Sequence, residues 1–425
     1  MSAGRRTIAI AGRGSGGQLS PGMAIAERRV DAAPGGRPRC LCSTRAIGAQ
    51  MLGDAGVDFR PVPAEGLSWK PAGLLRFARG YVRGLRAARR LLREEGVEHV
   101  VSLGGFVTGP VTAAAAALGI PITLVNLDAT PGRANRVAAR RAQRVISACE
   151  TPGLPRFAEA IVGMPLRRSA LAPAGRAECR GQLGLDPVRP CLLVTGASQG
   201  ASSINAFMVA FALKHRALLS HWQVLHLAGP KSSPSAAEID AAYARAGVKA
   251  LVLPFLNDMG LAWGAAELAL SRAGANSVAE AEANGVPTVF VPYPYHRDLH
   301  QEANAAPLVK AGAAVLAYDK LDVAVNMRSI GDPLEALLSD GRIRDDMENA
   351  LRARPQHDAA DAIARSILGF APAGRARLAA DAPVACNLSE RLRPPPVAEA
   401  SKPAANHARG QSHAGRRGVC ACQST

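Results

Sequence analysis

Short apolar runs alternate with longer segments whose apolar residues recur at helical spacing, and this pattern covers most of the chain. A short apolar run bounded by turn residues predicts a buried strand, and a 3.6-residue apolar period predicts a helix. The predicted strands are 7–12, 39–42, 57–62, 99–103, 121–128, 191–195, 223–227, 250–253, 268–270 and 288–291. The predicted helices are 21–30, 71–95, 111–118, 131–144, 203–213, 236–246, 258–263, 321–338, 343–352 and 359–367. Strands that alternate with helices are typical of parallel sheets, so the predicted fold class is α/β.

The alternation is interrupted once. The first series closes at Gly163, and after residues 164–168 the composition shifts to Ala, Pro and Gly, as is typical of a linker. A second series begins at Cys191, so we expect two Rossmann-like parallel-sheet domains facing each other across a cleft, residues 1–163 and 164–371. From Pro372 the chain has few large apolar residues and an excess of basic ones, which predicts a disordered basic tail over 372–425. Such a tail is either an anion-binding tether or passive.

Composition excludes some classes of protein. No run of about 18 uncharged apolar residues occurs, so we expect no membrane-spanning helix. The strand predicted at 7–12 leaves no room for a signal peptide before it, which favours a cytoplasmic protein. The eight cysteines form no Cys-x-x-Cys pair and have no histidine at zinc spacing, so we expect reduced thiols and no metal site.

The chain carries a formal charge of +17 and has a pI near 10.2, which either favours anionic partners or reflects an Arg- and Ala-rich composition. The predicted helix 71–95 combines seven arginines with an apolar face. Such a helix either lies on an anionic membrane surface or packs with a solvated basic side. The predicted helix 131–144 is a second basic surface. Only two aromatic residues, Phe77 and Tyr81, are interleaved with these arginines, so we do not expect nucleic-acid binding.

A glycine-rich loop follows the first predicted strand. Gly12, Gly14 and Gly17 match the G-x-G-x-x-G fingerprint of dinucleotide-binding folds. That fingerprint requires an acidic residue after the second strand to hold a ribose, but Ser43, Thr44 and Arg45 stand there instead. The pattern therefore favours a loop that faces another phosphate or a sugar, with the following helix starting late, at Pro21.

Polar residues gather at two strand ends within 271–304. The first group follows the strand at 268–270, and the second follows the strand at 288–291. Ligands of parallel α/β sheets bind at the carboxyl ends of strands, and helix N-termini favour negative charge. The two groups are Ser271, Arg272, Asn276, Ser277 and Glu280, and His296, Arg297, Asp298, His300, Gln301 and Asn304.

Residues 7–370 resemble a family that carries these motifs in the same order. The motifs are Gly14–Gly17 with Pro21-Gly22, Gly104–Pro110, Gly163–Arg167, Gly196–Ala201, Phe255–Met259, Arg272–Ala275, Glu280, and Val291–Tyr295 through Gln301 and Asn304. The family is the N-acetylglucosamine transferases of peptidoglycan synthesis, glycosyltransferase family 28, with a GT-B fold. Its members move N-acetylglucosamine from a UDP donor onto undecaprenyl-diphospho-N-acetylmuramoyl-pentapeptide.

The resemblance implies roles for individual residues. Arg167 and Ser198 would contact the donor diphosphate or nucleotide, Leu256 would pack beside the uracil, Glu280 would accept hydrogen bonds from the ribose hydroxyls, and Gln301 would bind the sugar hydroxyls. The remaining implied donor contacts are Ser15, Gly16, Gly17, Ala275, Asn276, Ser277, Val278 and Ala279. The implied acceptor-side residues are Gly104, Gly105 and Asn126. No cofactor or metal is implied, because a helix N-terminus and a glycine-rich loop can stabilise a diphosphate leaving group.

The chain departs from the family pattern on the acceptor side. The family's loop ends in Gly-Gly-His, whereas this chain has Gln18, and an amide cannot accept a proton near neutral pH. The family's His-Glu-Gln-Asn segment is here Val125 to Asp128. Our hypothesis is that Asp128 acts as the general base; the alternative is that Asp128 caps the helix that begins near Pro131.

These inferences predict a hexosyltransferase that inverts the anomeric centre, bound peripherally at the cytoplasmic face of the inner membrane. Its expected partners are UDP-N-acetylglucosamine, a lipid-linked muramoyl peptide and an anionic membrane surface. Two alternatives stay open: transfer to another lipid-linked acceptor, and a non-catalytic UDP-sugar-binding partner of the envelope machinery.

Overall fold

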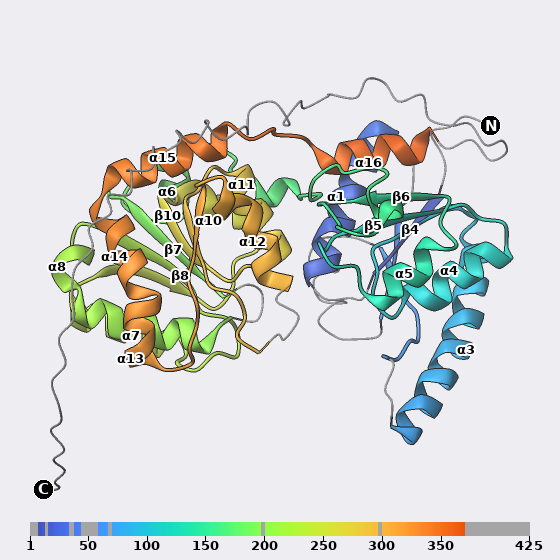
Figure 1. The fold of residues 1–425 in the computed structure, drawn as a ribbon, viewed down its shortest axis with the longest axis horizontal. Helices are drawn as coiled ribbons and strands as arrows, with labels where there is room; N and C mark the ends of the chain where they lie inside the picture. Colours follow the sequence, from blue (N-terminus) through green and yellow to red (C-terminus); the bar gives the residue numbers. More distant parts are fainter. Residues whose placement is uncertain are drawn as a thin grey trace, which may run out of the picture. The chain divides into compact units, whose positions relative to one another are not determined.

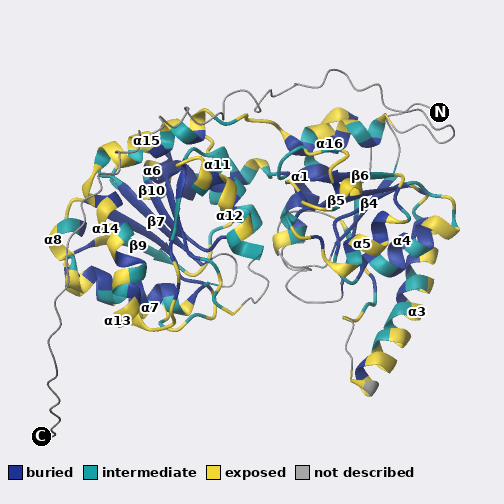
Figure 2. Cartoon of the chain, viewed as in Figure 1, coloured by how far each residue is buried: buried dark blue, intermediate teal, exposed yellow. Residues whose placement is uncertain are grey.

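A computed structural model describes residues 7–12, 16–33, 38–43, 58–66, 70–196, 200–295 and 300–369. The described residues form two six-stranded sheets, each with parallel strand pairs and with helices around it (Figure 1). Figure 2 shows that the strands of both sheets are largely buried. The α/β class predicted from the alternating pattern is therefore confirmed.

The first sheet has the strand order β3-β2-β1-β4-β5-β6. The chain runs from β1 outward through β2 and β3, then returns to the other side of β1 at β4, so the strand order reverses between β1 and β4. Ligands of such sheets bind outside the carboxyl ends of the strands at this reversal. The strands are Thr7–Ala11 (β1), Pro38–Cys42 (β2), Phe59–Pro61 (β3), Val97–Ser102 (β4), Ile122–Asn126 (β5) and Arg144–Ser147 (β6). The α-helices among them are Gly16–Ala32 (α1), Pro71–Glu94 (α3), Thr108–Ala117 (α4) and Arg133–Ala139 (α5).

The second sheet repeats this topology with the order β12-β11-β10-β7-β8-β9, so its reversal lies between β7 and β10. The strands are Cys191–Thr195 (β7), Gln223–Leu227 (β8), Lys249–Leu253 (β9), Leu268–Ser271 (β10), Thr288–Phe290 (β11) and Ala314–Leu316 (β12). The α-helices are Arg176–Gln182 (α6), Ser202–Lys214 (α7), Arg216–Leu219 (α8), Ala236–Ala246 (α9), Met259–Ala265 (α10), Ala275–Ala283 (α11), His300–Lys310 (α12), Val323–Ser329 (α13), Gly331–Ser339 (α14) and Gly341–Arg352 (α15). Short 3-10 turns occupy Pro155–Phe157 (η2) and Arg168–Ala170 (η3).

The last described helix, Ala359–Leu368 (α16), packs against α1 although it follows the second sheet along the chain. Its Ile363 and Ile367 are buried in the same apolar cluster as Ile10 of β1. Nε of Arg28 on α1 donates to Asp358 at 2.6 Å, just before α16 begins. Helix α16 is therefore part of the helical layer over the first sheet. The domain boundaries expected from the sequence stay a prediction.

Several predicted elements are corrected. Helix α1 begins at Gly16 instead of Pro21 and carries Pro21 inside it, because Leu19 and Met23 bury against the sheet on either side of the proline. The basic helix predicted to reach residue 144 ends at Ala139, since Arg144 begins β6, which pairs with β5. Strands β6 and β12 were not predicted, and the helix predicted over 321–338 is two helices, α13 and α14, which meet at the buried Ile330.

Candidate active site

The carboxyl ends of β7 and β10 lie side by side in the second sheet, because these two strands are neighbours in parallel register. The glycine-containing loop after β7 runs through 196–200, and α11 follows β10. Both segments therefore leave the sheet at the reversal of strand order, where ligands of this topology bind. The sequence predicted the same two segments as donor contacts.

The loop after β7 requires glycine at both ends. Gly200 has φ of +74°, and a Cβ there would lie 2.2 Å from the carbonyl oxygen of Ala228. A Cβ on Gly196 would lie 2.2 Å from the amide nitrogen of Ala201. A side chain at either position would therefore clash with the backbone. Ser198, the predicted diphosphate contact in this loop, lies outside the described residues.

Helix α11 begins after Gly274, which is extended and provides no side-chain cap. Backbone N–H groups in the first turn of a helix favour a negatively charged group. The predicted donor contacts occupy this N-terminal half of the helix, with Ser277 and Val278 buried. They are Ala275, Asn276, Ser277, Val278 and Ala279.

Glu280 is buried on α11, and its carboxylate accepts a hydrogen bond of 2.9 Å from the indole Nε1 of Trp263 on α10. Burial raises the pKa of Glu280 to about 7, although the Trp263 hydrogen bond opposes the shift. A carboxylate that is half protonated near neutral pH can respond to a ligand that donates hydrogen bonds to it. Trp263 was not anticipated from the sequence as its partner.

Gln301 and Leu256 lie in segments that follow other strands of the second sheet. The side-chain oxygen of Gln301 on α12 accepts a hydrogen bond of 2.9 Å from the backbone amide of Tyr293, in the segment after β11. Leu256 follows β9 and packs, half-buried, against the core of this sheet. The predicted polar residues His296, Arg297 and Asp298 lie outside the described residues.

Arg272, at the end of β10, is buried and pairs with Asp319 at 2.8 Å. Burial works to raise the pKa of Asp319, but hydrogen bonds from Ser203, Asn326, the Leu321 amide and Arg272 outweigh it and lower the pKa. Asp319 was missed in the sequence because a single acid after an unpredicted strand carries no repeated pattern. Arg167, a predicted diphosphate contact, instead pairs with Glu27 of α1 at 3.3 Å in this structure.

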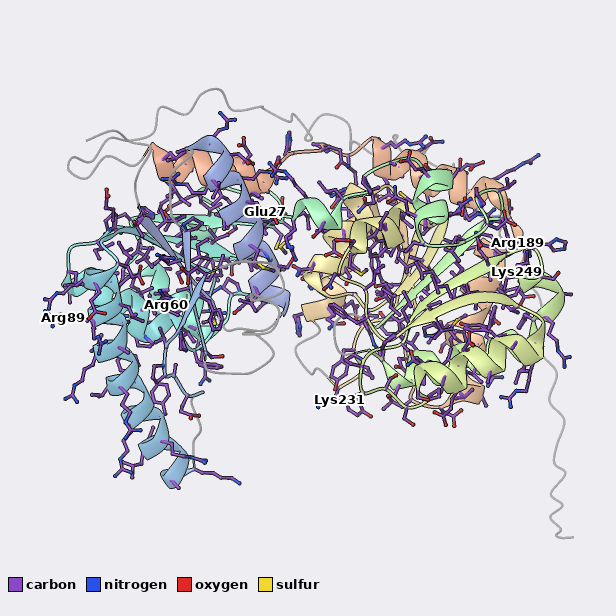
Figure 3. All side chains as sticks on the ribbon, turned by 180° about the vertical axis from the view of Figure 1, so that it is seen from behind. Glu27, Arg60, Arg89, Arg189, Lys231 and Lys249 are labelled. Carbon is purple, nitrogen blue, oxygen red and sulfur yellow. The ribbon has the colours of Figure 1, made fainter. Side chains whose placement is uncertain are left out.

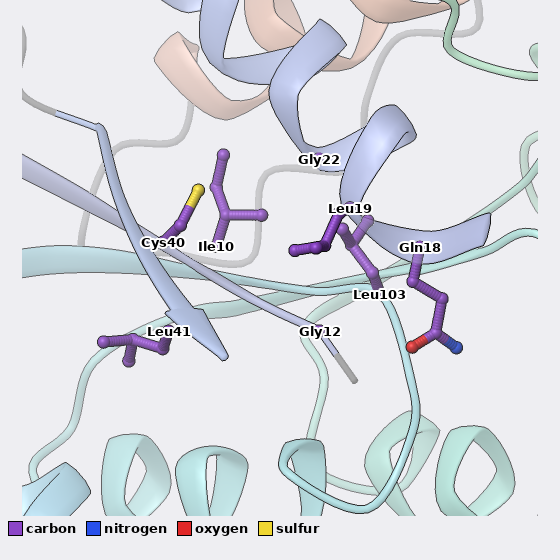
Figure 4. A pocket seen from close by; sticks show the side chains of 8 residues that line it. All are labelled: Ile10, Gly12, Gln18, Leu19, Gly22, Cys40, Leu41 and Leu103. Carbon is purple, nitrogen blue, oxygen red and sulfur yellow. The ribbon is translucent and has the colours of Figure 1, made fainter. Parts of the chain in front are cut away.

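The acceptor-side candidates lie at the carboxyl edge of the first sheet. Gln18 stands in the first turns of α1 and, with Gly12 and Leu103, lines a small pocket beside the end of β1 (Figure 4). Gly104 and Gly105 follow β4 with φ of +94° and +80°, which favours glycine at both positions. Three residues predicted as donor contacts also belong to this sheet: Gly16 begins α1, Gly17 is exposed, and Ser15 lies outside the described residues.

Asn126 is fully buried at the end of β5, and its side chain is engaged within the protein. Its Oδ1 accepts from Asn135 on α5 at 2.9 Å, and its Nδ2 donates to the backbone oxygen of Asp128 at 2.7 Å. A Cβ on Gly104 would lie 2.2 Å from Oδ1 of Asn135, so Asn135 packs directly on the glycine loop. Asn135, which the sequence analysis missed, therefore connects the loops after β4 and β5.

Asp128 lies on the segment that Asn126 holds, and its side chain is half-buried. Helix α5 begins five residues later, at Arg133, with Gly132 as its N-cap and no side-chain cap. Burial raises the pKa of the Cys149 thiol, and the negative charges of Asp128 and Glu150 raise it further. The carboxylates of Asp128 and Glu150 therefore both lie near Cys149.

The described residues contain no group of three or more His, Cys, Asp or Glu side chains that could hold a metal ion. Cys40, Cys42, Cys149, Cys179 and Cys191 are free thiols. Of the helices in the described ranges, none has the length and apolar character needed to cross a membrane.

Comparison with known proteins identifies both halves of the chain. Residues 8–147 match the glycosyltransferase family 28 N-terminal domain, and residues 191–353 match the family 28 C-terminal domain. A relative from Streptomyces avermitilis, named UDP-N-acetylglucosamine–N-acetylmuramyl-(pentapeptide) pyrophosphoryl-undecaprenol N-acetylglucosamine transferase, is 36% identical over 73% of this chain and 85% of its own. A relative of the same name from Xanthomonas campestris is 37% identical, and the match covers 87% of this chain and 83% of the relative's chain.

Among solved structures, the crystal structure of Acinetobacter baumannii MurG has a TM-score of 0.65 and 25% sequence identity, and the match covers 86% of this chain and 100% of that one. The two domain models and the identity to these relatives over most of their length show that the chain belongs to glycosyltransferase family 28.

Proposed function

We propose that this protein is a hexosyltransferase that moves N-acetylglucosamine from UDP-N-acetylglucosamine to undecaprenyl-diphospho-N-acetylmuramoyl-pentapeptide, with inversion at the anomeric carbon. The observation that carries the proposal is the position of Glu280 and the 196–200 loop at the reversal of strand order in the second sheet, in a chain whose relatives bear this transferase name.

The donor would lie along the carboxyl edge of the second sheet. The Glu280 carboxylate can accept hydrogen bonds from both ribose hydroxyls, and the first-turn N–H groups of α11 suit the diphosphate. The amide of Gln301, which lies on the next helix of the sheet, would contact the sugar. Such preorganised donors stabilise the charge that develops on the leaving diphosphate, so the protein would need no metal.

The acceptor hydroxyl would be activated from the first sheet. Asp128 supplies a carboxylate after β5, on the same sheet edge as Gln18 after β1. A general base has to carry the ionisable group that Gln18 lacks, and this favours Asp128. The replacement of the family's histidine by Gln18 also supports a second candidate function, which is UDP-sugar transfer to a different lipid-linked acceptor. The remaining alternative is a non-catalytic UDP-sugar-binding partner.

Donor binding should depend on pH through Glu280. Ribose hydroxyls donate to the ionised carboxylate, so below pH about 7 a proton must be released on binding, and affinity should fall as pH drops. Above that pH the carboxylate is ionised and affinity should level off. Calorimetric titration with UDP-N-acetylglucosamine from pH 6 to 8 measures this, because a diphosphate esterified at both ends does not itself titrate in this range.

Glu280→Gln should weaken donor binding about 10- to 100-fold and abolish its pH dependence, since hydrogen bonds to a charged group are the stronger ones. Glu282→Gln is the matched control, because Glu282 lies on the same helix and pairs with Arg354. Equal affinities in the two variants, or a wild-type affinity that is flat with pH, would count against this role for Glu280.

The membrane-facing surface would be α3. Leu74, Leu75 and Val82 are 50%, 53% and 45% exposed on this helix. Arginine side chains project along its length, as Figure 3 shows with Arg89 labelled. Exposed arginines on the helix are Arg76, Arg79, Arg83, Arg86, Arg89, Arg90 and Arg93. An exposed apolar face bordered by basic residues suits peripheral binding to anionic lipid, here the cytoplasmic face of the inner membrane.

Changing Arg76, Arg79 and Arg83 to Glu should weaken binding to anionic vesicles, because each basic residue near the surface contributes about 1 kcal/mol. Co-sedimentation with vesicles containing phosphatidylglycerol measures the loss. Arg245, Lys249 and Arg342, exposed on elements of the second sheet, provide a control triple with the same charge change. Identical losses in the two triples would mean that net charge, and not α3, drives binding.

A further inference from the structure

Two ion pairs flank strand β10, one at each end. Glu267 immediately precedes the strand and pairs with Arg180 of α6, whereas Arg272 immediately follows the strand and pairs with Asp319. The Asp319 side chain has no exposed area, and the side chain of Arg272 is 6% exposed. The second pair therefore lies at the ligand-binding edge of the sheet, and the first lies at the opposite edge.

Both oxygens of Asp319 are saturated with hydrogen bonds. Oδ2 accepts from Nη2 of Arg272 at 2.8 Å and from the hydroxyl of Ser203 at 2.5 Å. Oδ1 accepts from the Leu321 amide at 2.9 Å and from Nδ2 of Asn326 at 3.0 Å. Leu321 has φ of +61°, which is unfavourable for a branched side chain, and the carboxylate fixes the turn in this conformation.

Arg272 extends the network to the segment after β11. Its Nη1 donates to the carbonyl oxygens of Val291 at 3.3 Å and Pro292 at 3.1 Å. The next residue, Tyr293, donates its amide to Gln301. The position of Gln301 is therefore coupled to Asp319 through Arg272 and one backbone segment.

Ser203 extends the network to the loop after β7. Its hydroxyl accepts from Nη2 of Arg272 at 2.9 Å and donates to Asp319. Ser203 lies in the first turn of α7, directly after the 196–200 loop. Arg272 in turn is two residues before Gly274, the N-cap of α11. Three segments proposed to contact the donor therefore converge on one buried carboxylate that no predicted motif includes.

We propose that Asp319 is a positioning residue of the donor site, which sets the loops after β7, β10 and β11 through Arg272 and Ser203. The inference rests on the proposed function, because it assigns the donor to these loops. It is specific in its effect: a change at Asp319 alters the use of UDP-N-acetylglucosamine and leaves the use of the acceptor unchanged.

Asp319→Asn keeps the size of the side chain but removes the charge and one acceptor oxygen. The KM for UDP-N-acetylglucosamine should rise about tenfold, because displaced positioning groups lose binding and orientation. The KM for the lipid-linked acceptor should stay within about twofold of wild type, since the acceptor does not contact these loops. Glu267→Gln is the matched control: it breaks the pair at the opposite end of β10, so it should lower Tm without changing the donor KM.

Ser203→Ala is the milder second variant, in case Asp319→Asn does not fold. It retains the Arg272–Asp319 pair but removes the hydroxyl that bridges both partners, and the donor KM should rise about threefold. The inference is overturned if Asp319→Asn and Glu267→Gln change the donor KM by the same factor, or if Ser203→Ala leaves it unchanged. A folded wild-type protein that neither binds nor uses UDP-N-acetylglucosamine overturns the proposed function first, and this inference with it.

Discussion

Changing Asp128 to Asn should lower kcat for transfer to the lipid-linked acceptor by about 10²- to 10⁴-fold, the usual contribution of a general base. Asparagine has nearly the same shape as aspartate but cannot take the proton from the attacking hydroxyl. The affinity for UDP-N-acetylglucosamine should change little, because Asp128 lies after β5 of the first sheet, whereas most of the residues proposed to contact the donor belong to the second. Steady-state kinetics and calorimetry on the same preparation separate the two effects.

Glu150→Gln is the matched control for Asp128→Asn. Both carboxylates raise the pKa of the Cys149 thiol, so both lie close to it, and each substitution removes one negative charge from this neighbourhood. Only Asp128 lies on the segment that Asn126 holds at the end of β5. Near-normal kcat in Asp128→Asn, or an equal loss in both variants, would eliminate Asp128 as the base.

Changing Gly200 to Ala should abolish measurable donor binding and lower the free energy of unfolding by about 2–5 kcal/mol. The new Cβ would lie 2.2 Å from the carbonyl oxygen of Ala228 and 2.8 Å from Cα of Gly229, and the backbone would hold an unfavourable φ of +74°. Gly200 would have to move away from the segment after β8, which would disturb the loop that is proposed to contact the diphosphate. Urea unfolding and calorimetric titration measure the two losses.

Gly247→Ala isolates the effect of φ alone. Gly247 caps α9 with φ of +70°, and nothing lies within 4 Å of a Cβ placed there. This variant should lose only about 1–2 kcal/mol of stability and bind the donor normally. If Gly200→Ala behaves like Gly247→Ala, the loop after β7 does not require close backbone packing, and its assignment to the diphosphate loses support.

Local signals predicted much of the fold. Strand β8 and helix α9 begin and end at the predicted residues. Helix α9 is bounded by strong local signals, namely a capping box between Ser235 and Glu238 and Gly247 in the left-handed conformation. Helix α1 was predicted to start late because Pro21 normally lies near a helix N-terminus, and tertiary burial of Leu19 and Met23 overrides that preference.

Long-range packing could not be predicted. Helix α16 was expected from its apolar period. Its packing on α1, however, depends on contacts such as the one between Arg28 and Asp358, two residues that are 330 positions apart in the sequence. The same limit applies to the site. The segment around Glu280 was identified from its motif, whereas Asn135 and Asp319 are single polar residues whose partners become neighbours only in the folded sheet.

The measurement that decides the proposed reaction is transfer of radiolabelled N-acetylglucosamine from its UDP donor to undecaprenyl-diphospho-N-acetylmuramoyl-pentapeptide by the purified wild-type protein. The proposed function predicts a labelled lipid product that accumulates with time and is lost in Asp128→Asn and Gly200→Ala. Binding of UDP-N-acetylglucosamine by a folded wild-type protein without any labelled product from this acceptor would contradict it, and would favour another lipid-linked acceptor or a binding partner without catalysis.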